Sequence, residues 1–322
     1  MKTGTATVVK NAGSHFLLSE LPEWNIFPAV LRGKVRLGAG TSTNPVAVGD
    51  HVEVETLNDG TNWITAIEPR RNYIIRRSTN LSKEAHILAA NLDQVLLLVT
   101  VNHPVTSLTF IDRFLATAEA YRVPVVLVIN KMDLMTEEEK VTADEWKMLY
   151  EDLGYRVVKI AATNPDDVQR VRTLLQDKVT LLSGNSGVGK STLLNALFGE
   201  EKTRTGLIST SHDKGMHTTT FSEMYPLPIV HCALSSVNRQ RSWLIDTPGV
   251  KGFGGVEMDK YEVSHYFREL FQIGRECKYG DCLHINEPGC AVITAVEQGR
   301  IALSRYESYI SLLGDADESK YR

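Results

Sequence analysis

Residues 184–191 read GNSGVGKS, a stretch that fits the pattern G-x-x-x-x-G-K-[ST] in full. The apolar run VTLLS precedes it and the helix-forming run KSTLLNALFG follows, which is the strand–loop–helix context of a phosphate-binding loop. The glycines let backbone N–H groups face the phosphates, and the start of the helix adds the positive end of its dipole. The stretch therefore predicts an α/β domain that binds a nucleotide at the end of this strand.

The same loop and a second motif are expected to hold the phosphates and Mg²⁺. Lys190 can neutralise charge on the β- and γ-phosphates, and the Ser191 hydroxyl can bind Mg²⁺. The segment WLIDTPGV (243–250) supplies Asp246 at a strand end as a further Mg²⁺ ligand, and the Gly249 amide as a γ-phosphate contact. The predicted nucleotide contacts within the loop are Gly184, Asn185, Ser186, Gly187, Val188, Gly189, Lys190, Ser191 and Thr192.

Between these motifs, KGMHTTT (214–220) is polar and shows no clear secondary-structure pattern. One hydroxyl there is expected to bind Mg²⁺ and sense the γ-phosphate; we choose Thr219, with Thr218 as the alternative. The residue after DTPG is Val250, which cannot orient the attacking water as a glutamine does in Ras-type enzymes. His217 is the nearest replacement, because imidazole can accept a proton near neutral pH, although a surface histidine in a loop is the competing interpretation. The predicted catalytic residues are His217, Lys190 and Thr219.

A base-reading motif lies at 130–133, where NKMD follows the apolar run VPVVLVI. Ligands of α/β sheets bind at the carboxyl ends of strands, and the Asp133 carboxylate can accept both the ring N–H and the exocyclic amine of guanine. Adenine presents neither group in that arrangement, so the motif favours GTP over ATP. Asn130 can bind the base or tie neighbouring loops, and a weaker signal after YRVVKI suggests a backbone amide for guanine O6. The predicted base contacts are Asn130, Lys131, Met132, Asp133, Ala161 and Ala162.

The pattern of apolar runs and turn residues divides the chain into three parts. From about residue 92, apolar strands alternate with helical stretches, which is typical of a parallel sheet covered on both faces. Before that, five short β-forming runs separated by Gly and Asn/Asp turns favour a small barrel, an OB-fold by preference and an SH3-like barrel as the alternative. We expect an OB-fold barrel at 1–72, a GTPase domain with a mostly parallel sheet at 73–254, and a helical zinc-binding domain at 255–322.

Bulk composition excludes some classes of protein. The longest apolar runs, at 95–101 and 123–129, are too short to span a bilayer, and the first residues contain no apolar signal segment. These features predict a cytoplasmic protein with no membrane partner, and we expect a monomer. The net charge of −4 argues against a protein that coats nucleic acid by bulk charge, but it allows a local basic patch.

A cluster of metal-binding residue types lies near the C-terminus. Three cysteines and a histidine follow the spacing C-x₄-C-x-H-x₅-C. This set suits a tetrahedral, structural Zn²⁺ with no open position for catalysis, and the alternative is a group of unliganded thiols. The predicted zinc ligands are Cys277, Cys282, His284 and Cys290.

The order of the motifs is unusual, because the guanine-binding motif at 130–133 precedes the phosphate-binding loop at 184–191. The sequence of base reader, phosphate loop, Thr loop and DTPG is a cyclic rotation of the usual GTPase order. A circular permutation is physically tolerable because the ends of a domain often lie close together. With a barrel before these motifs and a Cys/His cluster after them, nearly the whole chain resembles the bacterial circularly permuted GTPases of the RsgA (YjeQ) type.

The resemblance implies a function as well as a fold. It implies hydrolysis of GTP to GDP, stimulated by the small ribosomal subunit, with Mg²⁺ beside the nucleotide and one structural zinc. It also implies a role in late maturation of that subunit and binding to its ribosomal RNA. Two other functions stay open: a GTPase directed at tRNA or another assembly substrate, and a non-enzymatic, GTP-gated RNA-binding adaptor. The intact Lys190, Ser191 and Asp246 count against the adaptor.

Contacts to RNA are expected from basic residues of the barrel and of the stretch that follows it. RNYIIRRS (71–78) and the arginine before it place four arginines within eight residues, although a solvated strand edge would look the same. The residues predicted to bind RNA are Arg32, Lys34, Arg36, Arg70, Arg71, Arg76 and Arg77.

Overall fold

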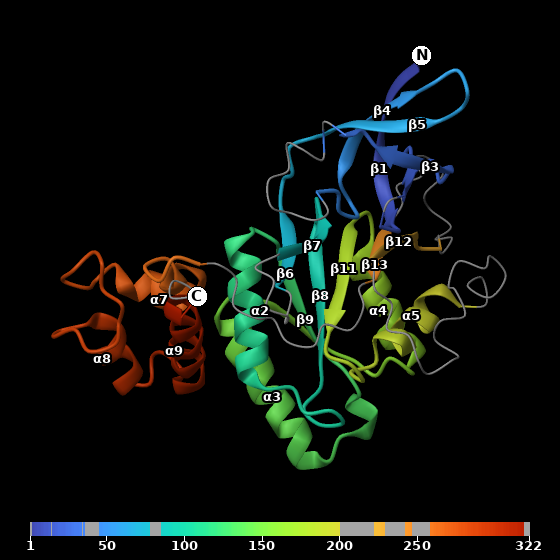
Figure 1. Ribbon diagram of the computed structural model, residues 1–322. Coiled ribbons are helices and arrows are strands. Elements are labelled where there is room, and N and C mark those ends of the chain that lie inside the picture. Colours follow the sequence, from blue (N-terminus) through green and yellow to red (C-terminus); the bar gives the residue numbers. More distant parts are fainter. Residues whose placement is uncertain are drawn as a thin grey trace.

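The computed structural model describes residues 2–13, 15–33, 35, 45–77, 85–199, 222–228, 242–246 and 258–318 (Figure 1). Within these ranges, the first strands form a barrel, the middle of the chain forms an α/β domain, and the last part forms a helical lobe. The three parts follow one another along the chain in the predicted order.

Five short strands close into the N-terminal barrel. Their alternating pattern buries inward side chains such as Val8, Phe16, Val52 and Ile64, while neighbouring residues face outward. The pairings β1–β2, β2–β3, β3–β5, β5–β4 and β4–β1 form a ring in which only β3–β5 is parallel, and five strands in a ring agree with the favoured OB type. The strands are β1 (Lys2–Asn11), β2 (His15–Ser19), β3 (Ile26–Leu31), β4 (His51–Thr56) and β5 (Asn62–Ile67).

The α/β domain is built on the sheet predicted from the apolar runs. Its strands lie in the order β10-β9-β8-β11-β13-β12, and all pairs are parallel except β12 with β13. Every residue of β8 and β9 is buried, which explains why both sequences are apolar apart from Gln94. The strands are β8 (Gln94–Val99), β9 (Val125–Ile129), β10 (Arg156–Lys159), β11 (Val179–Gly184), β12 (Glu223–Pro226) and β13 (Trp243–Asp246); β6 (Tyr73–Arg77) and β7 (Ala85–Ala90) form a separate pair before them.

Helices cover both faces of this sheet. Helices α2 and α3 pack on one face through residues such as Phe114, and α4 and α5 pack on the other through residues such as Leu193. Ser107, Thr136 and Asn164 cap the starts of α2, α3 and α4, since each side-chain oxygen accepts a backbone N–H of the first turn. The helices are α2 (Leu108–Ala120), α3 (Glu137–Asp152), α4 (Pro165–Leu175) and α5 (Lys190–Phe198), with a 3-10 turn, η1 (Met132–Leu134), after β9.

The barrel and the α/β sheet are joined into one continuous sheet of eleven strands. The link is an antiparallel pairing of β1 with β12, at which Lys10 and Glu223 also form an ion pair of 2.9 Å. Beside it, the rings of Trp24 and Trp243 stack with centroids 5.0 Å apart. The sequence did not predict this joint, because nothing in the local pattern shows that β12 is shared.

In its described residues, 258–318, the C-terminal lobe consists of helices joined by turns and loops, without strands, as the loss of the strand pattern predicts. Its core contains Phe267, Leu270, Val292 and Tyr309. It packs against the α/β domain through α9, which lies beside α2 (Figure 1). Its elements are η3 (Val263–Tyr266), α7 (Arg268–Gly274), α8 (Ala291–Glu297) and α9 (Leu303–Glu318).

A buried ion network fixes this lobe to α2. Arg305 is 1% exposed, and its Nη1 donates to Asp112 Oδ1 at 2.8 Å while its Nε donates to Glu269 Oε1 at 2.7 Å. Tyr150 of α3 donates to the same oxygen of Asp112 at 2.7 Å, and the guanidinium lies 4.7 Å from the Phe267 ring. Burial opposes the charge of Arg305, but the two carboxylates outweigh it and raise the pKa of the guanidinium. The network therefore stays charged and joins four helices, α2, α3, α7 and α9.

Replacing this arginine should loosen the lobe. In Arg305→Met, Asp112 and Glu269 would remain buried without a cation, a situation that costs about 3–5 kcal/mol. We expect the slowest amides of α9 to exchange at least about 100-fold faster, measured by hydrogen exchange with mass spectrometry. Arg268→Met is the matched control in the same interface, because Arg268 is 41% exposed and pairs with Glu119 at the surface. Equal effects of the two substitutions would contradict the assignment.

Candidate functional site

The phosphate loop runs from the end of β11 to the start of α5. Gly184 and Gly189 have positive φ angles of 144° and 100°. A Cβ atom on Gly184 would lie 2.3 Å from the Leu98 carbonyl oxygen, and one on Gly189 would lie 2.3 Å from Asn130 Nδ2. Both positions require glycine for their backbone conformation and for their close neighbours, which is why the motif is strict there.

Lys190, the first residue of α5, folds back over this loop. Its Nζ donates to the carbonyl oxygens of Gly184 at 2.7 Å and Asn185 at 2.6 Å. Burial lowers the pKa of Lys190, and the nearby Asp246 carboxylate acts in the opposite direction. A partly desolvated ammonium group above a loop of backbone N–H groups is suited to phosphate oxygens, because their charge would compensate the lost hydration.

Asn130 joins the base-reading loop to the phosphate loop. Its side chain is buried, and its Nδ2 donates to the Val188 carbonyl at 2.9 Å. Its Oδ1 accepts from the Ala162 amide at 3.0 Å. The sequence left two roles open for Asn130, binding the base or joining neighbouring loops, and the structure shows that it joins the loops.

The two alanines predicted to meet guanine O6 donate their amides elsewhere. The Ala161 N–H donates to Asp167 Oδ2 at 2.6 Å, and the Ala162 N–H donates to Asn130. A contact from either amide to the base would have to share its hydrogen with these acceptors. Both residues line the loop, as expected, but this geometry does not favour them as primary donors.

Asp133 has a neighbour that the sequence did not suggest. The hydroxyl of Thr163 donates to Asp133 Oδ2 at 3.1 Å, and both residues are exposed. Such a bond fixes one carboxylate oxygen and so sets the direction in which the other faces. A threonine four residues after a strand is too common a pattern to have identified it.

The segment 100–107, between β8 and α2, contacts both loops and was also missed. The Lys131 ammonium donates to the His103 carbonyl at 2.5 Å, and Lys131 adopts the left-handed conformation with φ 65°. On the other side, Pro104 lies 3.4 Å from the position that a Cβ on Gly187 would take. The Asn102 amide donates to Glu139 of α3. This segment therefore lies beside both the base-reading and the phosphate loops.

The other predicted nucleotide contacts fall in or beside the same region. Ser191 and Thr192 are exposed in the first turn of α5, and Ser186 is exposed in the loop. Asp246 ends β13 opposite Leu182 of β11, so its carboxylate lies close to the phosphate loop. Three predicted residues lie outside the described residues, together with the alternative Thr218: His217, Thr219 and Gly249.

The four predicted metal ligands converge in the C-terminal lobe. One ligand atom from each of Cys277, Cys282, His284 and Cys290 lies within 4.8 Å of the others. The Cys290 sulfur is 3.4 Å from His284 Nδ1, 3.7 Å from the Cys282 sulfur and 3.8 Å from the Cys277 sulfur. A tetrahedron of sulfur ligands at 2.3 Å from a metal has edges of about 3.8 Å. The donor set and its spacing fit a four-coordinate metal ion.

The surrounding loop holds these ligands in position. The Glu287 carboxylate accepts three backbone N–H groups of the ligand loop. Two tyrosines of α9 donate to the loop carbonyls: Tyr306 to His284 at 2.7 Å and Tyr309 to Leu283 at 2.6 Å. The ligand spacing was readable from the sequence, but these supports lie up to 26 residues away from the groups they bind.

Comparison with known proteins identifies the family. A profile of the RsgA GTPase family matches residues 67–255. A Phocaeicola vulgatus protein named small ribosomal subunit biogenesis GTPase RsgA is 51% identical over 98% of both chains, and a Bacteroides fragilis protein of the same name is equally similar. This chain belongs to the RsgA GTPase family. It is therefore a GTPase, a hydrolase acting on GTP.

Solved structures agree with this membership in the RsgA family. YjeQ from Thermotoga maritima is 31% identical, covers 98% of this chain and 99% of its own, and superposes with a TM-score of 0.74. YloQ, described as a circularly permuted GTPase, is 24% identical, covers 100% of this chain and 97% of its own, and shares the fold with a TM-score of 0.70. The permuted order predicted from the motifs is thus confirmed.

The arginines predicted to bind RNA differ in how the structure places them. Arg70 is bound to the buried Asp50 through Nε at 2.6 Å and Nη2 at 2.7 Å, so it supports the barrel and is poorly placed to bind a ligand. Arg32 and Arg71 are more than half exposed, paired with Glu55 and Asp93. Lys34, Arg36 and the side chains of Arg76 and Arg77 lie outside the described residues.

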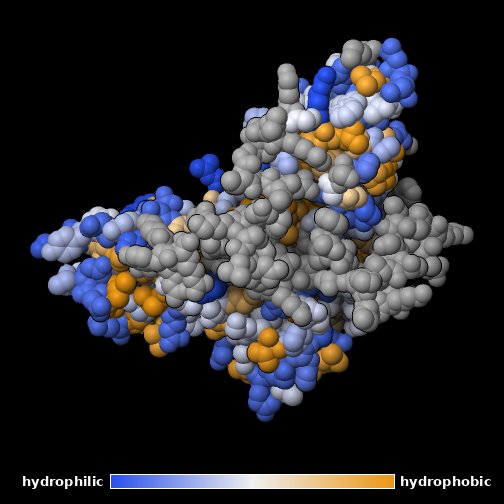
Figure 2. Space-filling view, in the orientation of Figure 1, coloured by the Kyte–Doolittle hydropathy of each residue, from blue (hydrophilic) through white to orange (hydrophobic). Residues whose placement is uncertain are grey.

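No helix in the part of the chain that the structure describes is long and apolar enough to cross a membrane. On the face drawn in Figure 2, the lower lobe built around α3 is mostly hydrophilic, with a few hydrophobic side chains between. Exposed apolar residues of this region, such as Val141 and Met148, stand among charged ones. Scattered exposure of this kind is ordinary.

Thr163 should contribute to nucleotide affinity through Asp133. Thr163→Ala removes a hydrogen bond to a charged acceptor, an interaction of about 1.5 kcal/mol, and should weaken GDP binding by roughly 10-fold. Thr163→Ser retains the hydroxyl and should bind nearly as the parent does. Titration with a fluorescent GDP analogue measures both. Parent-like affinity in the alanine variant would show that Asp133 needs no such support.

Proposed function

We propose that this GTPase binds the small ribosomal subunit, hydrolyses GTP faster on it, and takes part in late maturation of that subunit. The proposal is supported by relatives that carry the name small ribosomal subunit biogenesis GTPase and match 98% of this chain. The observation that supports its GTPase part is the joined site, in which Asn130 bonds the base-reading loop to the phosphate loop. We propose binding to ribosomal RNA, a cytoplasmic location and a monomeric state as part of the same function.

Each residue of the nucleotide site has a proposed task. Lys190 neutralises the β- and γ-phosphates from its position over the loop. Ser191, Asp246 and Thr219 would hold Mg²⁺, which would neutralise and orient the phosphates. His217 accepts a proton from the attacking water. The water oxygen bonds to the γ-phosphorus, the bond to the bridging oxygen breaks, and GDP and phosphate leave.

The domain boundaries predicted from the sequence are proposed for the protein, and the proposed RNA contacts change. We propose a barrel at 1–72, a permuted GTPase domain at 73–254 and a zinc-binding domain at 255–322. Among the described cations, the exposed Arg32 and Arg71 are the better candidates for phosphate contacts. Lys34, Arg36, Arg76 and Arg77 remain proposed contacts, while Arg70 serves the barrel.

GTP turnover with and without purified small subunits tests the function. We expect strong stimulation by small subunits and none by large subunits or tRNA. His217→Ala should retain GTP affinity and lower the stimulated turnover at least ~10-fold, which is within the range for a lost proton-handling group. Stimulation by tRNA would favour the tRNA-directed GTPase, and no turnover under any condition would favour the adaptor. Unchanged stimulated turnover in the variant would remove His217 from the mechanism.

We propose that the Cys₃His cluster holds one structural zinc ion. The purified protein should carry about one zinc per chain by metal analysis, because three thiolates and an imidazole select this metal. Removal by a chelator should unfold the C-terminal lobe while GTP binding persists, since the ligand loop loses its cross-link. Hydrogen exchange of α8 and α9 reports the unfolding. A metal-free protein with a protected lobe would refute the proposal.

A further inference from the structure

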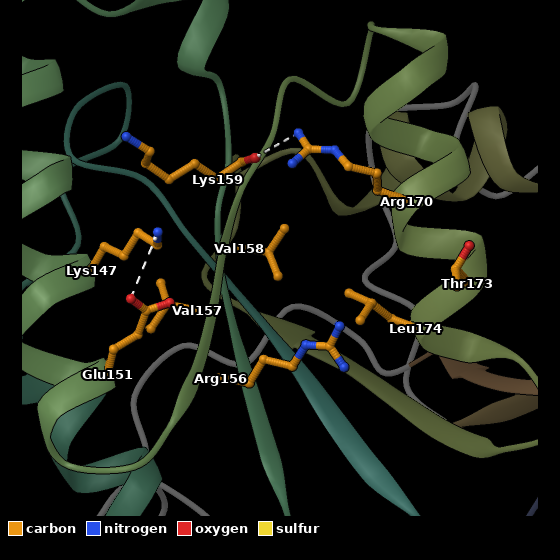
Figure 3. Close-up of a pocket in the computed structure, with 9 residues that line it drawn as sticks. All are labelled: Lys147, Glu151, Arg156, Val157, Val158, Lys159, Arg170, Thr173 and Leu174. Atoms are coloured by element: carbon orange, nitrogen blue, oxygen red, sulfur yellow. Dashed lines mark hydrogen bonds and ion pairs between the residues drawn. The ribbon is translucent and has the colours of Figure 1, made fainter.

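One edge of the α/β sheet forms a groove that the nucleotide site does not use. β10 is the last strand in the order of the sheet, and α3 and α4 stand on either side of it (Figure 3). The groove over this edge has a volume of about 590 Å³. Lys147 and Glu151 of α3 line one wall, and Arg170 and Leu174 of α4 line the other.

The floor of the groove is a strand edge that pairs with no further strand among the described residues. Ile160, just after β10, exchanges backbone hydrogen bonds with the β9 side. Because alternate residues of a strand face the same neighbour, Val157 and Lys159 direct their backbone groups away from β9. The Lys159 carbonyl accepts from Arg170 Nη2 at 3.2 Å. The N–H and C=O of Val157 and the N–H of Lys159 therefore face the groove, which suits a short added strand.

The walls of the groove are cationic on both sides. Lys147 and Lys159 lie toward α3, and the guanidinium groups of Arg156 and Arg170 lie toward α4 (Figure 3). Three of these cations have carboxylate neighbours: Glu151 lies 3.7 Å from Lys147, and Asp144 and Asp167 pair with Lys159 and Arg170. Arg156 is exposed and adds the excess positive charge.

We propose that this edge binds an extended, carboxylate-rich segment of a partner protein as an added β-strand. Successive side chains of such a segment would point alternately toward the two walls, so carboxylates at either position reach a cation. The backbone groups of Val157 and Lys159 supply the pairing. This inference is independent of the ribosomal function proposed above, since it concerns a different surface.

Other occupants fit the groove less well. A second copy of the chain would bring its own excess positive charge, at Arg156, to the same edge, which disfavours pairing. Cationic side chains at a strand edge generally discourage pairing with another copy of the same edge. The same side chains favour pairing with an acidic strand. RNA offers phosphates for the cations, but it has no regularly spaced N–H and C=O groups for the strand edge.

Binding of a labelled peptide to the full-length protein tests the inference. The probe is a fluorescein-labelled Glu-Glu-Val-Glu-Glu-Val peptide, followed by anisotropy, with the matching lysine peptide as a negative control. The double variant Lys147→Glu, Arg156→Glu should weaken binding at least ~10-fold through charge reversal. Lys140→Glu, on α3 outside the groove, makes the same kind of change and should alter binding less than about 2-fold. Basal GTP turnover should stay unchanged in all of them.

Hydrogen exchange of residues 156–160 locates the bound peptide. Strand addition should slow the amides of Val157 and Lys159, whereas the amides of Arg156 and Val158 already face β9. Four outcomes would overturn the proposal. These are no saturable binding of the acidic peptide, an equal loss in Lys140→Glu, slower exchange elsewhere only, and preferential binding of a labelled single-stranded RNA or a second copy at this edge.

Discussion

One buried side chain, Asn130, holds the nucleotide site together. Asn130 and Val188, whose carbonyl it binds, lie 58 residues apart in the chain, and no short stretch of backbone connects their two loops. Because its two polar atoms bind the phosphate loop on one side and the loop after β10 on the other, all three segments keep a fixed spacing. The same amide leaves no room for a Cβ at Gly189, so a residue of the base-reading motif imposes glycine on the phosphate loop. A site assembled in this way does not depend on which loop comes first in the chain, and the permuted order is tolerated for that reason.

The two outer domains are fixed to the α/β domain by different kinds of interaction. The barrel continues the sheet, through the pairing of β1 with β12 and the stack of Trp24 on Trp243. The C-terminal lobe is fixed by the buried charges of Arg305, Asp112 and Glu269. Two paired strands can shift relative to each other only by a change of register. A buried ion network is lost as a whole when one of its charged partners is removed. The barrel should therefore move together with β12, whereas the lobe is either docked or released.

The sequence predicted those features that depend on local pattern. Strand and helix rhythm identified the barrel and the parallel sheet, and the strict glycines and Lys190 identified the phosphate loop because backbone geometry constrains those positions tightly. The Cys/His spacing was readable because all four ligands lie within fourteen residues, 277–290. What the sequence did not predict is held by contacts between distant residues: Thr163 beside Asp133, Pro104 beside Gly187, and the shared strand β12. Arg70 looked like part of a basic patch, but its partner Asp50 lies twenty residues earlier and only the fold brings them together. Residues 200–221 and 247–257, which carry His217, Thr219 and Gly249, stay at the level of prediction.

The docking of the C-terminal lobe also bears on how the permuted chain resists force. In the permuted order, the C-terminal lobe follows β13, the last strand of the α/β sheet in the chain. The lobe packs against α2, which lies near the start of the α/β domain. Arg305 and Asp112 are 193 residues apart, so their contact closes this long excursion without a covalent bond. A pull on the C-terminus would load the contact between α9 and α2 before any tension reached β13. A docked lobe would therefore bear such a load before the end of β13, the strand that carries Asp246.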